Sequence, residues 1–291
     1  MFRNRHLLWG IGPAIAFLIA IFVGPFLYMV YLSLTDLSFA APERDGNFIG
    51  LWNYIQALTD DTEFLMSLLR SALFSVLCVL PQVLIGIISA ELLYQHRIIK
   101  KIIAPVFILP VLLPAVVVGL YWKLLLQGEF GMISFYLAEW GLTFAKRILS
   151  DADSILLTLA IIDSWQWGPF VILMFITARG SLENTPLEAA FIDGASKIRG
   201  FFDVTLHRLI PMVLIVSFVR AIDSFKEFDK IFILTGGGPG TASELTSLFV
   251  WRQAFKSWEF GYAASLCVVI FLGIYIVTSL STRRIKLGPR K

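Results

Sequence analysis

The chain has 291 residues, of which 57% are hydrophobic and only 15% are charged. Soluble globular domains carry about 25% charged residues, so this composition excludes an ordinary water-soluble protein, a disordered chain and a disulfide scaffold. The formal net charge of +3 is too small to indicate a nucleic-acid partner. We therefore expect a polytopic membrane protein.

Apolar runs long enough to cross a bilayer, which takes about 20 residues, occur in five places. A sixth run is shorter and is followed by charged residues, so hydropathy alone does not decide it. The first run is too long for a signal peptide and lacks a small-residue cleavage pattern. The expected spans are Leu8–Leu34, Ser71–Ala90, Ile102–Trp122, Ser154–Ala178, Leu209–Val219 and Phe260–Thr282.

Basic residues gather in four segments, namely the two chain ends and the loops 95–101 and 180–208. Positively charged flanks stay in the cytoplasm, and both ends lie there only if the number of spans is even. We therefore expect one membrane domain over residues 1–291, with six spans and both termini cytoplasmic. The expected outer segments are Asp36–Ser67, Gln127–Asp153 and Asp229–Glu259. The basic residues are Arg3, Arg5, Arg97, Lys100, Lys101, Arg179, Lys197, Arg199, Arg208, Arg283, Arg284, Lys286, Arg290 and Lys291.

The 180–208 loop contains the signals of a short helix. Thr185 is a candidate N-cap, Pro186 suits the first helical position, and Glu188 completes a capping box with Thr185. Gly194 suits the helix end. A helix of about two turns is not stable alone in water, so we expect it to pack against its own bundle or a partner.

The same loop resembles a family signature. Glu188-Ala189-Ala190, followed by Gly194, is similar to the EAA loop of the membrane subunits of binding-protein-dependent ABC importers. The surrounding residues resemble the carbohydrate-uptake type, as in maltose, trehalose and glycerol-phosphate permeases. His207 stands where the family pattern has proline. Three further stretches match that group in order, namely Phe48–Tyr54 (FxGLxNY), Leu234–Pro239 (LTGGGP) and Phe255–Ala264.

The resemblance implies an all-α, type I importer-like fold of six transmembrane helices in the bacterial inner membrane. It also implies a second homologous permease, a dimer of ATPase subunits and an extracytoplasmic binding protein as partners, besides membrane lipid. ATP and magnesium would be bound by the ATPase, leaving this chain without a cofactor or a catalytic residue. The residues implied in ATPase coupling are Glu188, Ala189, Ala190, Asp193 and Gly194.

Nothing in the sequence indicates nucleotide or metal binding by this chain itself. The glycine-rich stretch Gly236–Gly240 lacks the lysine and serine or threonine of a phosphate-binding loop, so we expect a flexible turn. We find no HExxH motif and no paired cysteine and histidine ligands.

Charged residues inside the spans are expensive and usually face the bundle interior or a cavity. Asp163, Arg220 and Asp223 lie at comparable depth by helical rise, which predicts an ion-paired cluster beside the translocation path. The alternative is that the charges after Val219 only solubilise the outer end of span five. Glu227 and Lys230 are expected near the outer surface.

Polar and aromatic residues near that depth suit sugar hydroxyls and sugar C–H faces. The candidates for the substrate pathway are Trp165, Gln166 and Trp167, with Gln82 in span two. Tryptophan is also common as an interface anchor, which is the alternative interpretation of both tryptophans. Prolines are expected to bend span three and free backbone carbonyls, which fits a cavity lining or plain packing around a kink. They are Pro105, Pro110 and Pro114.

The leading hypothesis is the membrane subunit of an ATP-driven importer of a carbohydrate or polyol, such as a sugar, sugar alcohol or glycerol. The alternative is a secondary carrier driven by an ion gradient, with Asp163 and Asp223 as ion sites. A receptor or scaffold is a weaker third interpretation. The sequence does not name the substrate or which permease of a pair lines the path, and it leaves open whether His207 matters.

Overall fold

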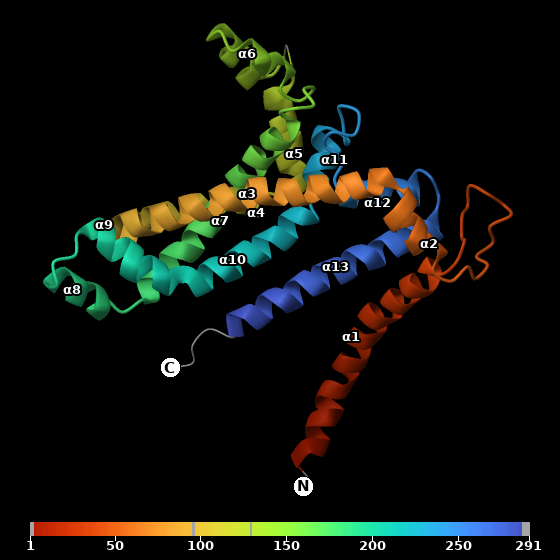
Figure 1. Ribbon diagram of the computed structural model, residues 1–291, viewed down its shortest axis with the longest axis horizontal. Helices are drawn as coiled ribbons and strands as arrows, with labels where there is room; N and C mark the ends of the chain where they lie inside the picture. The colour runs from red at the N-terminus through yellow and green to blue at the C-terminus, as the bar shows by residue number, and fades with distance from the viewer. Residues whose placement is uncertain (1–2, 95–96, 129, 287–291) are drawn as a thin grey trace. The chain divides into compact units, whose positions relative to one another are not determined.

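The computed structural model describes residues 3–94, 97–128 and 130–286 (Figure 1). These residues fold into helices joined by turns and loops, with one isolated bridge between Thr35 and Phe48. The all-helical fold that the sequence predicts is therefore confirmed.

The chain forms two compact units, one of residues 1–66 with 249–282 and the other of residues 67–248 with 283–291. The single membrane domain expected from the sequence stays a prediction. The first unit contains α1 (Arg3–Ser33), α2 (Trp52–Ile55), the π-helical turn η1 (Gln56–Asp60) and α13 (Phe260–Lys286), which continues a few residues past the unit.

The second unit holds most of the helices, and two of them, α3 and α12, also extend into the first unit. Its elements are α3 (Thr62–Tyr94), α4 (Arg97–Leu112), α5 (Ala115–Leu126), α6 (Met132–Glu139), η2 (Thr143–Arg147), α7 (Ile155–Ser181), α8 (Thr185–Ile192), α9 (Lys197–Gly200), η3 (Phe201–Leu206), α10 (His207–Phe225), α11 (Asp229–Leu234) and α12 (Thr246–Phe255).

The core of the second unit lies where three long helices meet. Val83 and Ile87 of α3 pack against Val171 and Phe175 of α7 and against Val216 of α10. This apolar contact places α3, α7 and α10 side by side, which brings together polar residues that are far apart in the sequence.

Within the described residues, five helices are long and apolar enough to cross a membrane by themselves, and a bent pair raises the number to six if it counts as one span. Six is the predicted number. The fifth span is longer than expected, because α9, η3 and α10 form one run from Lys197 to Phe225. Much of the segment predicted as loop is thus helical.

Span three is not one helix, as its prolines suggested. The chain breaks between α4 and α5 at Leu113 and Pro114, where the helix axes turn by 93°. Pro114 has extended backbone angles (φ −56°, ψ 140°) and starts α5 as a new helix. Proline suits this position because it lacks the backbone N–H that a continuing helix would use. The bend that the prolines predict in the span Ile102–Trp122 is therefore present, and it is sharp enough to divide the span into two helices.

The predicted orientation depends largely on side chains that the structure does not describe. The basic residues at both chain ends and in the 95–101 loop lie outside the described side chains. The cytoplasmic placement of the termini stays a prediction.

Candidate functional site

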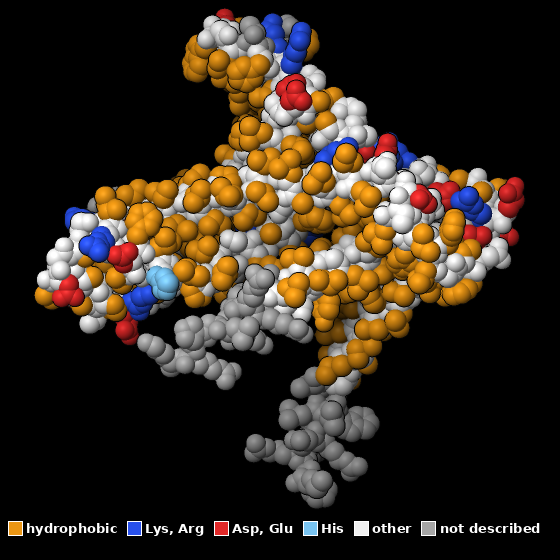
Figure 2. Space-filling model, in the orientation of Figure 1, with side chains coloured by type: hydrophobic (Ala, Val, Ile, Leu, Met, Phe, Trp, Pro, Cys, Tyr) orange, Lys and Arg blue, Asp and Glu red, His pale blue; other side chains and the backbone are white. Residues whose placement is uncertain are grey.

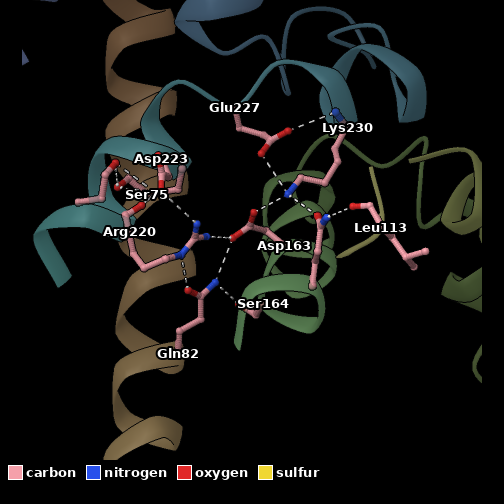
Figure 3. Close-up of polar contacts among 12 residues, drawn as sticks. Ser75, Gln82, Leu113, Asp163, Ser164, Arg220, Asp223, Glu227 and Lys230 are labelled. Carbon is pink, nitrogen blue, oxygen red and sulfur yellow. Dashed lines mark hydrogen bonds and ion pairs between the residues drawn. The ribbon is translucent and has the colours of Figure 1, made fainter. Parts of the chain in front are cut away.

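Asp163 of α7 is the centre of a buried polar cluster (Figure 3). Its side chain has no exposed surface, and its two oxygens face two cations. Arg220 Nη2 of α10 lies 2.7 Å from Oδ2, and Lys230 Nζ of α11 lies 2.6 Å from Oδ1. Both cations are themselves only 2% exposed, so all three charges lie away from water. The Asp163 carboxylate offsets part of the positive charge of Arg220 and Lys230.

Gln82 of α3 joins the same cluster from a third helix. Its Oε1 accepts from Arg220 Nε at 3.0 Å, and its Nε2 donates to Asp163 Oδ2 at 3.0 Å. The same nitrogen lies 3.3 Å from Ser164 Oγ. One amide thus satisfies a donor and an acceptor together, which fixes its orientation between α3, α7 and α10.

Gln166 connects the cluster to the break in span three. Its Oε1 accepts from Lys230 Nζ at 3.1 Å, and its Nε2 donates to the carbonyl of Leu113 at 3.0 Å. That carbonyl lies directly before Pro114, where the helix stops. A backbone carbonyl at a helix break in an apolar surrounding needs a donor from elsewhere, and Gln166 supplies it.

Two acidic residues complete the cluster at its edge. Glu227 Oε2 lies 3.0 Å from Lys230 Nζ, whereas Asp223 lies 4.0 Å from Arg220 and is 37% exposed. Burial raises the pKa of the Glu227 carboxyl above its ordinary value, with Lys230 opposing that shift. Burial by itself would lower the pKa of Lys230, but Asp163 and Glu227 more than offset it, so the ammonium stays charged.

The predicted ion pair between Asp163 and Arg220 is confirmed, and Asp223 is peripheral to it. Lys230 is buried within the chain, and its expected place near the outer membrane surface stays a prediction. In sequence Lys226 and Lys230 look alike, but only Lys230 lies on α11, which packs on α5. A Cβ on Gly119 of α5 would lie 3.1 Å from Ile233, so glycine permits this close approach.

The two tryptophans near Asp163, Trp165 and Trp167, lie in different surroundings. Trp167 faces the cluster, with the Arg220 guanidinium 4.9 Å from the centre of its ring. Trp165 is 39% exposed and makes an edge contact with Trp122 of α5 at 5.5 Å. Their predicted contact with substrate stays a prediction.

The short helix predicted in the 180–208 loop is present as α8, but its start differs from the prediction. The N-cap is Asn184, whose carbonyl accepts from the backbone N–H groups of Leu187 and Glu188, each at 2.9 Å. Thr185 is already helical, so the predicted capping box does not form. The Asn184 side chain instead accepts from the Tyr94 hydroxyl at 2.9 Å.

Gly194 ends α8 as expected. It has φ +89°, a left-handed conformation that favours glycine. The backbone N–H of Ala195 donates to Ala190 at 2.9 Å, and that of Gly194 donates to Phe191 at 3.1 Å. This pair of bonds is a Schellman motif, which satisfies the last carbonyls of the helix and reverses the chain.

One side of α8 packs on α9. A Cβ on Gly200 would lie 2.9 Å from Phe191 and 3.0 Å from Leu187, so the missing side chain leaves room for both. None of the α8 side chains, all of which the structure describes, is buried. Ile192 is 86% exposed, and Ile198 of α9 and Phe202 of η3 are exposed as well. The residues implied in coupling therefore lie beside an apolar surface that the described chain leaves open.

His207, where the family pattern has proline, is exposed at the junction of η3 and α10. Its backbone N–H donates to the carbonyl of Val204, a bond that proline cannot make. The substitution thus fits the unbroken helix at this point.

Two of the matching outer motifs hold the first unit together. Asn53 is buried, and its Nδ2 donates to the carbonyls of Ser33 at 3.0 Å and Thr35 at 2.9 Å, which lie at the end of α1. Gly261 at the start of α13 approaches the Thr35 carbonyl so closely that any Cβ there would collide with it. These residues position loops, which explains their place in a shared pattern.

The glycine-rich turn is held by its own side chains. Ser243 Oγ donates to the Gly238 carbonyl at 2.6 Å, and Thr235 Oγ1 accepts from the N–H of Gly237 at 3.2 Å. Gly236, Gly237 and Gly240 have positive φ. Among the described residues, no group of three or more His, Cys, Asp or Glu is placed to hold a metal ion.

The chain resembles known transport proteins along its length. It is 31% identical over 283 residues to a probable ABC transporter permease protein of Bacillus subtilis, a match that covers 96% of this chain and 95% of the relative. It is 26% identical over 277 residues to the trehalose/maltose transport system permease protein of Thermococcus litoralis, covering 95% and 91%.

A solved structure has the same fold. The chain matches a bacterial ABC transporter involved in the import of the acidic polysaccharide alginate with a TM-score of 0.81 at 16% identity, covering 99% of this chain and 97% of the other. Residues 82–288 match the family described as the binding-protein-dependent transport system inner membrane component. The chain therefore belongs to the family of inner membrane components of binding-protein-dependent transport systems.

Proposed function

We propose that this chain is the permease subunit of an ATP-driven importer that carries a carbohydrate or polyol across the bacterial inner membrane. The family membership supports the transport role, and the trehalose/maltose permease and the alginate transporter support a carbohydrate as substrate. The alternative of an unrelated receptor has no support in these relatives.

The observation that carries the proposal is the geometry of α8. A helix of two turns is held in place by a Schellman motif and by Gly200, yet it leaves Ile192 and its neighbours exposed. Exposed apolar side chains in an ordered loop mark a protein contact. We propose that an ATPase subunit covers this surface, and that Glu188 and Asp193 form its polar rim.

ATP and magnesium would then be bound by the ATPase, and this chain would supply no catalytic residue. Closure of the ATPase pair would move α8, and the continuous helix from α9 through η3 to α10 would pass that motion to the spans. ATP acts only by binding one conformation better than the other.

The buried cluster would serve as a joint in that motion. The polar groups of Asp163, Gln82 and Gln166 are already hydrogen-bonded inside the protein. Their partners include Arg220, Lys230 and the Leu113 carbonyl. Among the predicted pathway residues, partly exposed Trp165 and Asp223 are therefore the better candidates for touching substrate.

Further partners would be a second homologous permease and an extracytoplasmic binding protein. The first unit supports a membrane partner, because α1 exposes apolar side chains such as Phe17 and Phe22 along most of its described length. Lipid or a second permease would cover them. We propose that the chain crosses the membrane six times with both termini in the cytoplasm.

An ion-gradient carrier is less well supported. Such a carrier needs an acidic group that exchanges a proton or sodium ion. Both oxygens of Asp163 already face cations, at 2.6 and 2.7 Å. A carboxylate held in this way is a poor exchange site, which favours the ATP-driven mechanism.

The test is uptake by the complex purified from its native membranes with its co-purifying subunits. Ile192→Asp places a charge on the exposed face of α8 and is expected to abolish ATP-dependent uptake and reduce ATPase co-purification. Glu183→Gln, at an exposed position just before the helix, is the matched control and is expected to transport normally. Normal uptake by Ile192→Asp, or uptake driven by an ion gradient without ATP, would contradict the proposal.

A further inference from the structure

The segment between α5 and α7 carries α6, a short helix that exposes large apolar side chains although its most buried residue is polar. On α6 the small polar residue Ser134 is fully buried, and Gly131 before it is also buried. Met132, Phe135 and Tyr136 point outward and are each at least half exposed. A helix on a water-facing surface turns its apolar stripe inward instead.

The position of this helix is fixed by close backbone packing on α5. A Cβ on Gly131 would lie 2.5 Å from the carbonyl oxygen of Leu125 and 2.6 Å from the nitrogen of Gln127. The N–H of Gly131 donates to Gln127 at 2.7 Å. Figure 1 shows α6 at the far end of α5, which is the second half of the bent candidate span. The exposed residues are thus held beside the end of a membrane segment.

The exposed surface is rich in aromatic residues. Hydrophobic side chains gather over α6 in Figure 2, and the flanking residues Phe130 and Trp140 are 90% and 77% exposed. We call this surface the α6 face, made of Phe130, Met132, Phe135, Tyr136 and Trp140. Tryptophan and tyrosine concentrate where bilayers meet water, because their amphipathic rings suit both environments.

Charged residues lie next to the α6 face. Glu139 is the one charged residue within α6 and stands in its last turn, while Lys146 and Arg147 follow in η2 and are exposed on the described surface. Long basic side chains reach lipid phosphates while their stems stay on apolar surface.

We propose that the α6 face lies in the headgroup–acyl boundary of the lipid bilayer as an in-plane anchor. Helices of this kind bury their apolar side about 5–10 Å into that boundary. α11 packs on α5 and places Lys230 beside Asp163. An anchor at the end of α5 therefore also helps to hold α11 in position.

Spin-label accessibility tests the proposal on the full chain. Phe135→Cys, Trp140→Cys and Ser150→Cys are each made with Cys78 and Cys267 replaced by alanine. The chain is purified with its co-purifying subunits and reconstituted in vesicles of phosphatidylethanolamine and phosphatidylglycerol. Collision of each label with oxygen is compared with its collision with a water-soluble nickel chelate. Ser150 is an exposed position of the same segment and serves as the aqueous control.

The oxygen-to-nickel ratio at positions 135 and 140 is expected to exceed that at position 150 several-fold. Equal ratios would mean that the α6 face lies in water and would overturn the proposal. Exclusion of both reagents would mean that protein covers the face, and would overturn it too. If Trp140→Cys does not assemble, Tyr136→Cys on the same face gives the same reading.

Discussion

The cluster around Asp163 and the helix α8 differ in which groups they bury. The cluster buries polar groups, whereas α8 exposes apolar ones. In the cluster, the polar atoms of four helices bond to one another inside the second unit. In α8 the helix ends are satisfied within the loop, but the apolar side chains are left exposed. Buried polar groups that bond to one another indicate a contact that holds the helices together. An exposed apolar surface indicates that a partner covers it.

The largest expected effect comes from breaking the cluster at its centre. Asp163→Ala leaves Arg220 and Lys230 buried without a counter-charge, and removing one partner of a buried ion pair costs about 3–5 kcal/mol. We expect the midpoint of thermal unfolding in detergent to fall on the order of 10 °C. Asp223→Asn, at the half-exposed edge, is the control and should cost less than about 1 kcal/mol. Equal midpoints for the two variants would refute the central role of Asp163.

The next effect concerns the link to the helix break. Gln166→Leu leaves the Leu113 carbonyl and one donor of Lys230 without their partners, and a buried polar group left unsatisfied costs about 1–3 kcal/mol. Thermal unfolding measures the loss, with exposed Gln127→Leu as the control. A stability unchanged by Gln166→Leu would show that another group satisfies the broken helix.

A smaller change in stability, with a larger change in transport, is expected at the end of α8. Gly194→Ala forces a residue with a Cβ into a left-handed conformation, which costs about 1–2 kcal/mol. No neighbour lies within 4 Å of the added carbon, so the strain is in the backbone alone. ATP-dependent uptake should fall several-fold. Gly180→Ala adds the same carbon in open space without positive φ and should leave uptake unchanged.

The smallest expected effect tests where α8 begins. The sequence predicts Thr185 as the N-cap, whereas the structure has Asn184 there. Thr185→Ala should change stability by less than about 0.5 kcal/mol, because Thr185 is an exposed helical residue and not the cap. A capping box would instead lose about 1 kcal/mol and some uptake. Thermal unfolding and uptake of this single variant decide between the two starts.

Local patterns were enough to predict much of the molecule. Apolar runs of bilayer length predict the spans, since a spanning helix must satisfy its backbone internally and cover itself with apolar side chains. The proline and glycine positions in the 180–208 loop predict a short helix ending at Gly194, because both residues restrict backbone angles locally. The family resemblance came from the same local stretches.

Other features depended on contacts between distant residues. The sequence by itself determined the membrane class, the short helix at 185–192 and the pairing of Asp163 with Arg220, because helical rise and residue type fix depth and backbone geometry. Only the tertiary structure decided that Lys230 is buried, that Gln166 donates to the Leu113 carbonyl and that the α6 face is exposed. The first two depend on which helices pack together, and glycines such as Gly119 permit the close approach that this packing needs.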